Sequence, residues 1–288
     1  MTMIESGGDS FGSEITTMPG TLGEARQLID NLQSQLVRYN LDLKLASEFQ
    51  RHLMLKEPKQ IPGYDIGIYY NQAGDPGLGG DVVSLTYPLE KNESGPILRV
   101  FVGDAVDKGP KAALIGALVL ATLQSAVSLP IYDSPKQVLI YMNQIMWQLT
   151  ETNLFTTGLY GLLYVNGLFT YARAGHEQLM VFDAEGNPVQ VELKPGQPLG
   201  ISESLTLDTG EVYIMPGGLL VLRSDGLSDE TDPELEILGN EKLIKIIQKE
   251  IHLPAAELAL QIEGALCDFQ GGTPQADDHS LVVIKREY

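Results

Sequence analysis

A long stretch near the start of the chain carries apolar residues in steps of three and four. The repeat holds for more than four heptads with polar flanks, which is typical of a left-handed coiled coil. Gln50 breaks this seam, and Pro58 and Pro62 are expected to end the helix. We predict a helix that pairs as a parallel homodimer through residues 22–53, receives a regulator, or lies on its own domain. The seam consists of Leu22, Ala25, Ile29, Leu32, Leu36, Tyr39, Leu43, Ala46, Gln50 and Leu53.

From residue 58 onward, short apolar or alternating runs lie between turn residues, which predicts an α+β domain over 58–288. Asn166-Gly167 is the strongest hairpin signal, and Ser134-Pro135 marks the start of a helix. We expect two sheets with helices outside, preceded by a mobile tail over 1–20 and a helical linker over 21–57. Strands are expected at 64–70, 82–87, 100–102, 158–165, 168–174, 179–182, 189–193, 205–207, 212–215, 219–222 and 279–285, a polar hairpin connection at 91–95, and helices at 110–128, 134–150, 240–252 and 254–269.

The composition excludes several classes of protein. A net charge of −19 opposes binding to nucleic acid, and the apolar residues, although 43% of the chain, form no run that predicts a membrane span. The single cysteine, Cys267, excludes an intrachain disulfide and fits a reducing cytoplasm. Its helical, largely apolar setting indicates a packing role. Since the first residues also lack the order of a signal peptide, we expect a cytoplasmic protein that binds neither membranes nor nucleic acid.

Acidic residues stand where predicted strands begin or end. Asp81 opens one strand, Asp104 and Asp225 follow two others, and Asp277-Asp278 precede the last, each beside a glycine or another acid. Carboxylates without clustered His or Cys are the ligands that hard cations such as Mg²⁺ and Mn²⁺ prefer. Gly-Asp pairs also form turns, so spacing alone leaves both separate turns and a shared metal site open.

Short motifs follow one another in a fixed order along the chain. They are Gly79-Gly80-Asp81, Gly103-Asp104 with Lys108-Gly109 and Ala112-Ala113-Leu114, Leu159-Tyr160-Gly161, Ala174-Gly175-His176, Pro198-Leu199-Gly200, Ser224-Asp225-Gly226 and Asp277-Asp278. Each motif is weak alone, but the ordered set is specific. Over roughly residues 46–286 it resembles the SpoIIE/RsbU-type branch of the metal-dependent protein Ser/Thr phosphatases, the protein phosphatase 2C superfamily.

The resemblance implies a β-sandwich flanked by helices, with two Mn²⁺ or Mg²⁺ ions at one edge. Asp104 would bridge the ions, the carbonyl of Ala105 would help to hold one, and Asp81, Asp225 and Asp277 would complete the site. The ions would activate water for in-line attack on phosphoserine or phosphothreonine, without a protein nucleophile. The implied substrate is a phosphorylated STAS-type anti-sigma-factor antagonist of a bacterial partner-switching pathway.

Three residues in or near these motifs need separate interpretation. Asp107 replaces a small residue, and it either adopts a positive φ angle, adds charge near the metals, or is a solvated loop acid. His279 stands where the family motif usually continues Asp-Asp-Ile-Thr, and contact with the phosphate is one hypothesis for it. His176 is interpreted as a hydrogen-bonding turn residue rather than a ligand.

Two alternatives to an active protein phosphatase stay open at this point. The chain could be a signalling scaffold that keeps the fold without turnover, or a hydrolase of a small phosphoester. The presence of every motif acid favours catalysis.

Overall fold

The computed structural model describes residues 21–54, 61–74, 77–86, 95–128, 134–149, 154–192 and 196–288. The expected tail over 1–20, the helix end at Pro58 and most of the hairpin connection at 91–95 lie outside these residues. The chain divides into two compact units, Met1–Leu45 and Ala46–Tyr288. Each unit is described by itself.

Helix α1 (Leu22–Met54) begins in the first unit, and its last residues belong to the second. It begins with a capping box, in which the Glu24 backbone N–H donates to Thr21 Oγ1 at 3.3 Å and the Thr21 N–H donates to Glu24 Oε2 at 3.0 Å. Most of the apolar seam in the first unit is exposed, including Ile29, Leu32 and Leu36, whereas Ala25 and Leu43 are half-buried. Pairing of this helix therefore stays a prediction.

The second unit contains two antiparallel five-stranded sheets. The first sheet has the order β1-β10-β9-β6-β7, and the second has the order β2-β3-β4-β5-β8. The first sheet consists of β1 (Tyr64–Asn71), β10 (His279–Arg286), β9 (Leu219–Arg223), β6 (Met180–Phe182) and β7 (Pro188–Val189). The second consists of β2 (Asp81–Thr86), β3 (Ile97–Ala105), β4 (Thr156–Tyr164), β5 (Leu168–Ala174) and β8 (Thr209–Tyr213).

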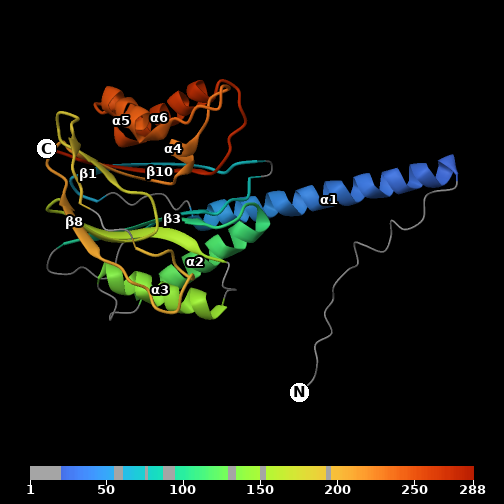
Figure 1. Ribbon diagram of the computed structural model, residues 1–288, viewed down its shortest axis with the longest axis horizontal. Helices are drawn as coiled ribbons and strands as arrows, with labels where there is room; N and C mark the ends of the chain where they lie inside the picture. Colours follow the sequence, from blue (N-terminus) through green and yellow to red (C-terminus); the bar gives the residue numbers. More distant parts are fainter. Residues whose placement is uncertain are drawn as a thin grey trace, which may run out of the picture. The chain divides into compact units, whose positions relative to one another are not determined.

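Helices cover the outer faces of both sheets, so that the unit has four layers (Figure 1). Helices α2 (Pro110–Ser128) and α3 (Pro135–Leu149) pack on the second sheet, whereas α4 (Gly226–Asp229), α5 (Gly239–Glu250) and α6 (Ala255–Gln270) lie over the first. Pro110 begins α2 as predicted, and Ser134 Oγ accepts a hydrogen bond from the Gln137 N–H at the start of α3. The expected α+β sandwich flanked by helices is confirmed.

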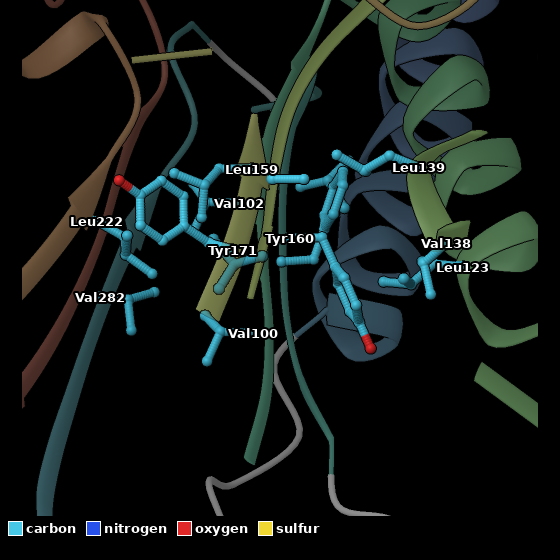
Figure 2. Close-up of a cluster of buried hydrophobic side chains, with 14 of the residues drawn as sticks. Val100, Val102, Leu123, Val138, Leu139, Leu159, Tyr160, Tyr171, Leu222 and Val282 are labelled. Carbon is cyan, nitrogen blue, oxygen red and sulfur yellow. The ribbon is translucent and has the colours of Figure 1, made fainter. Parts of the chain in front are cut away.

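The core lies in layers because the central strands, such as β9 and β10, are buried on both faces. Figure 2 shows Val102 and Tyr171 of the second sheet facing Leu222 and Val282 of the first. On its other face, Tyr160 points toward the helices α2 and α3 (Figure 2). A separate apolar cluster fills the space between the first sheet and helices α5 and α6. Because both faces of these strands are buried, their sequences are nearly continuous apolar runs rather than alternating ones.

Three features differ from the sequence-based expectations. The strand expected at 189–193 is only the two-residue β7, since both of its residues are exposed and residues 190–192 form no strand. Residues 205–207 form no strand, because Leu207 is a single buried anchor before β8 begins at Thr209. Cys267 is exposed, so the packing interpretation was wrong. The buried face of α6 includes Leu266, and the next residue along a helix points about 100° away from it.

Within the described residues, one helix is long and apolar enough by composition to cross a membrane, namely α2. No such stretch was expected from the sequence. Half of its apolar window is buried, and the helix packs on α3, β2 and β3. Its composition is thus explained by its place between a sheet and another helix.

Candidate functional site

Asp81 and Asp104 are neighbours across an antiparallel strand pair. Asp81 is the first residue of β2, and its register partner on β3 is Asp104. Partners in such a pair project from the same face of the sheet, so both carboxylates lie on one side. Strand β3 continues through Asp104 to Ala105, further than expected, and the Ala105 N–H donates to the Gly80 carbonyl at 3.0 Å. The pair is therefore built into the sheet rather than into a free turn.

The other acids come from the first sheet. Asp225 follows β9 and begins α4 without capping it through its side chain, and Asp277-Asp278 precede the neighbouring strand β10. Ser224 ties the two loops together, because its hydroxyl donates to the Asp278 carbonyl at 3.2 Å and accepts from the Ser280 N–H at 3.0 Å. Both loops thus end at the same edge of the sandwich.

Asp278 joins the acids of the two sheets. Its carboxylate accepts hydrogen bonds from the N–H of Ala73 at 2.8 Å and from the N–H of Asp81 at 3.3 Å. A Cβ atom at Gly79 would lie 1.8 Å from Asp278 Oδ2, and one at Gly80 would lie 2.4 Å from the Ala105 carbonyl oxygen. Only glycine permits this close approach, which gives the Gly79-Gly80 motif its physical reason.

The carboxylates raise one another's pKa. Burial raises the pKa of Asp104 to about 7, helped by the charges of Asp225, Asp277 and Asp278. Burial also raises the pKa of Asp81, with contributions from Asp104 and Asp278. Asp225 and Asp278 are shifted in the same direction, again mainly by burial. Each ionised acid disfavours the ionisation of its neighbours, and a cation bound among them would relieve this repulsion.

The donor set fits a hard divalent cation in its chemistry. The predicted donors, Asp81, Asp104, Asp225, Asp277 and the carbonyl of Ala105, all offer oxygen. Asp81 Oδ2 is buried and has no hydrogen-bond partner among the described residues. Among the described residues, no group of three or more Asp, Glu, His or Cys side chains is already arranged to hold a metal ion. The roles of these five residues as ligands therefore stay predictions.

Lys108 is the cation next to these acids. Its Nζ lies 3.0 Å from Asp277 Oδ2 and donates to the Ala276 carbonyl at 2.6 Å, and its charge lowers the pKa of Asp104. The sequence marked Lys108 only as part of a motif. Asp107 has a φ angle of 85° and pairs with Lys111 at 2.9 Å. Two of the interpretations of Asp107 therefore apply together, the positive φ angle and the solvated position on the loop.

His279 lies on the helix side of the first sheet. Its buried ring contacts Glu230 and Glu263, so the hypothesis that it contacts the phosphate is wrong. Side chains alternate along β10, and the next residue, Ser280, points back toward the acids, where its hydroxyl opposes the rise in the Asp81 pKa. The contact of His279 with two glutamates was not predicted, because the three residues come from separate elements.

Two further buried polar residues support the edge of the sheet. His176 Nδ1 lies 2.8 Å from Thr157 Oγ1, and burial lowers the His176 pKa to about 3, which keeps the ring neutral. This agrees with a hydrogen-bonding turn residue. The guanidinium of Arg223 pairs with Glu177 at 2.8 Å and donates to Ser228 Oγ at 3.0 Å. It was missed because sequence alone does not reveal that an arginine in an apolar strand is buried and paired.

Comparisons with known proteins agree with this architecture. The family model described as "Stage II sporulation protein E (SpoIIE)" matches residues 95–287. The Phosphoserine phosphatase RsbU of Bacillus subtilis is 25% identical over 278 residues, covering 96% of this chain and 78% of the relative.

Two solved structures show the same fold. The SiaA-PP2C domain of Pseudomonas aeruginosa has a TM-score of 0.73 at 19% identity, covering 88% of this chain and 99% of that one. RsbX in complex with magnesium has a TM-score of 0.56 at 14% identity, covering 81% and 100%. Since the family model extends over two thirds of the sequence, the chain belongs to the SpoIIE family, and it has the fold of the protein phosphatase 2C domains.

Proposed function

We propose that this chain is a metal-dependent protein serine/threonine phosphatase of the partner-switching type. The observation that carries the proposal is the group of acids that two sheets bring to one edge, in a chain of the SpoIIE family. The name of RsbU, a phosphoserine phosphatase, and the magnesium in the RsbX structure support the activity and the metal.

Each acid has a distinct task in this proposal. Asp81, Asp104, Asp225, Asp277 and the Ala105 carbonyl would hold two Mn²⁺ or Mg²⁺ ions, with Asp104 shared between them. Bound there, the ions supply hydroxide at neutral pH and neutralise phosphate charge. Hydrogen bonds from the backbone to Asp278 hold the loop before Asp81 in place.

Lys108 orients Asp277 through the ion pair at 3.0 Å. Both side chains are well exposed, so this pair contributes little to the stability of the fold. Its task is to keep one carboxylate at the edge of the sandwich. The proposed mechanism needs no protein nucleophile. The one cysteine, Cys267, is not assigned this role, and its thiol donates to Glu263 on the same helix.

The proposed substrate is phosphoserine or phosphothreonine in a folded, STAS-type bacterial signalling protein. A net charge of −19 disfavours long-range attraction to an acidic phosphoprotein, so recognition depends on the metals and on short-range contacts near Asp81 and Asp104. Docking of a folded partner orients its phosphoryl group for in-line attack, which lowers the barrier by several kcal/mol.

The N-terminal helix is proposed to form a parallel homodimer through residues 22–53 or to bind a regulator. The exposed Leu32 and Leu36 in the seam support this proposal, because an isolated helix gains little from exposed leucines. We also propose a cytoplasmic location, since the one cysteine of the chain is a free thiol.

The decisive experiment measures phosphate release with Mn²⁺ from three substrates: a phosphorylated STAS-type protein, a short phosphopeptide and p-nitrophenyl phosphate. We expect the highest kcat/KM on the folded protein, no activity for Asp104→Asn, and normal activity for the exposed neighbour variant Asp107→Asn. Turnover in EDTA would refute the metal mechanism. Activity only on small phosphoesters would indicate a metabolite hydrolase, and no activity on any substrate would indicate a scaffold.

A further inference from the structure

A charged triad is buried behind the acidic edge. His279 Nε2 lies 2.8 Å from Glu230 Oε2, and His279 Nδ1 lies 3.1 Å from Glu263 Oε2. The side chains of His279, Glu230 and Glu263 are only 1%, 0% and 12% exposed. Three ionisable groups are therefore removed from water together, and each must be satisfied by the others.

Both ring nitrogens of His279 are engaged. Nε2 faces Glu230 and Nδ1 faces Glu263, so one ring joins the two glutamate side chains. The other glutamate oxygens also have donors, since the Thr231 N–H reaches Glu230 Oε1 at 3.3 Å and Cys267 Sγ reaches Glu263 Oε1 at 3.7 Å. The network is thus fully connected and rigid.

The triad holds both acid-bearing loops of the first sheet from behind. His279 directly follows Asp277-Asp278, and Glu230 ends the short helix α4 that Asp225 begins. Glu263 lies on α6 and anchors the ring to the helix layer. Only the four residues of α4 separate Asp225 from Glu230, so these two residues cannot move far relative to each other. The contact between Glu230 and His279 therefore fixes the loop of Asp225 relative to the loop of Asp277.

We propose that the triad of Glu230, His279 and Glu263 is a positioning device that sets the separation of Asp225 and Asp277, and thereby the affinity of the site for divalent ions. This inference rests on the proposed metal-dependent function. Stability alone is a poor explanation for the triad, because well-packed apolar residues usually stabilise a fold as much as a buried ionic network or more. Residues that orient metal ligands typically change metal affinity about 10- to 100-fold when replaced.

The test compares variants of the triad with a matched control in the full chain. Glu230→Gln removes the charge of one partner of His279, and His279→Gln removes the ring that joins the two glutamates, so both weaken the link between the loops. Glu263→Gln weakens its anchor on α6. Asp65→Asn is the control, since Asp65 Oδ2 accepts the Ala255 N–H at 2.7 Å and caps α6 at the far end of the same strand pair. Asp65 thus supports the same helix and sheet without contacting the acids.

Two quantities are measured on EDTA-stripped protein: the dissociation constant for Mn²⁺ by calorimetry, and the melting temperature without metal. We expect Glu230→Gln and His279→Gln to weaken Mn²⁺ binding about 10- to 100-fold. Asp65→Asn should lower the melting temperature with an unchanged dissociation constant. If His279→Gln does not fold, Glu263→Gln provides the test, because its side chain is partly exposed and its replacement is milder.

Triad variants that melt early but bind Mn²⁺ with wild-type affinity would overturn the inference and show a purely structural role. Wild-type protein that binds no Mn²⁺ would refute the proposed function together with the inference. The two failures are therefore distinguishable from the calorimetry of the wild-type protein alone.

Discussion

Replacing Asp104 by asparagine should stabilise the metal-free protein at alkaline pH. Burial and three neighbouring acids raise the Asp104 pKa from 3.8 to about 7. At about 1.36 kcal/mol per pKa unit, holding this carboxylate ionised in the folded state costs up to about 4 kcal/mol relative to the unfolded chain. Asparagine has nearly the same shape without the charge, so the variant avoids this cost.

The pH dependence has a definite sign. The folded state binds the Asp104 proton more tightly than the unfolded state does, so the wild-type protein loses stability as the pH rises from about 4 to about 7. Above that range the loss is complete. The stability advantage of Asp104→Asn should therefore be largest at pH 8 and approach zero near pH 4.

Urea unfolding in EDTA, followed by far-UV circular dichroism and by the fluorescence of the single tryptophan, measures this difference at both pH values. Asp107→Asn is the control, because the pKa of the exposed Asp107 is lowered by its hydrogen bond with Lys111 and no stabilisation is expected. Adding Mn²⁺ should stabilise the wild-type protein and leave Asp104→Asn unchanged. An Asp104→Asn variant that is no more stable than wild type at pH 8 in EDTA would refute the electrostatic reasoning.

Further predictions concern packing and assembly. Gly80→Ala should destabilise the fold by about 1–3 kcal/mol and abolish Mn²⁺ binding, because the new Cβ would lie 2.4 Å from a backbone oxygen, as urea unfolding and calorimetry can measure. Gly264→Ala, in a helix with nothing within 4 Å, should instead stabilise by up to about 1 kcal/mol. Replacing Leu32 and Leu36 with Asp should convert the dimer into monomers in light scattering. A wild-type monomer would exclude pairing through this seam.

The elements of the fold were predictable where local chemistry decides them. Pro110, Ser134 and Asn166-Gly167 mark a helix start, a cap and a hairpin through interactions within a few residues. The heptad seam likewise predicted α1. Helix α4 was missed because four residues are too short to show a helical period.

The candidate site was predictable in its residue types but not in its connections. Sequence motifs indicated the acids, yet they could not show that Asp278 bonds the backbone of Asp81 across 197 residues. The ion pair of Lys108 with Asp277 and the contacts of His279 arise in the same way, from elements that meet only in the folded protein. Adjacent residues at the start of a strand point to opposite faces, and sequence alone does not say which face is which.

The acids of the site belong to two different sheets, and this has a consequence for how the protein is made. Asp81 and Asp104 come from the second sheet, whereas Asp225 and Asp277 come from loops of the first. A nascent chain cannot bring all four acids to one edge until β10 has inserted between β1 and β9. Contacts so distant in sequence form slowly, so metal capture is delayed until the sandwich closes. A partly folded chain consequently has no complete site with which to remove phosphate from its partners.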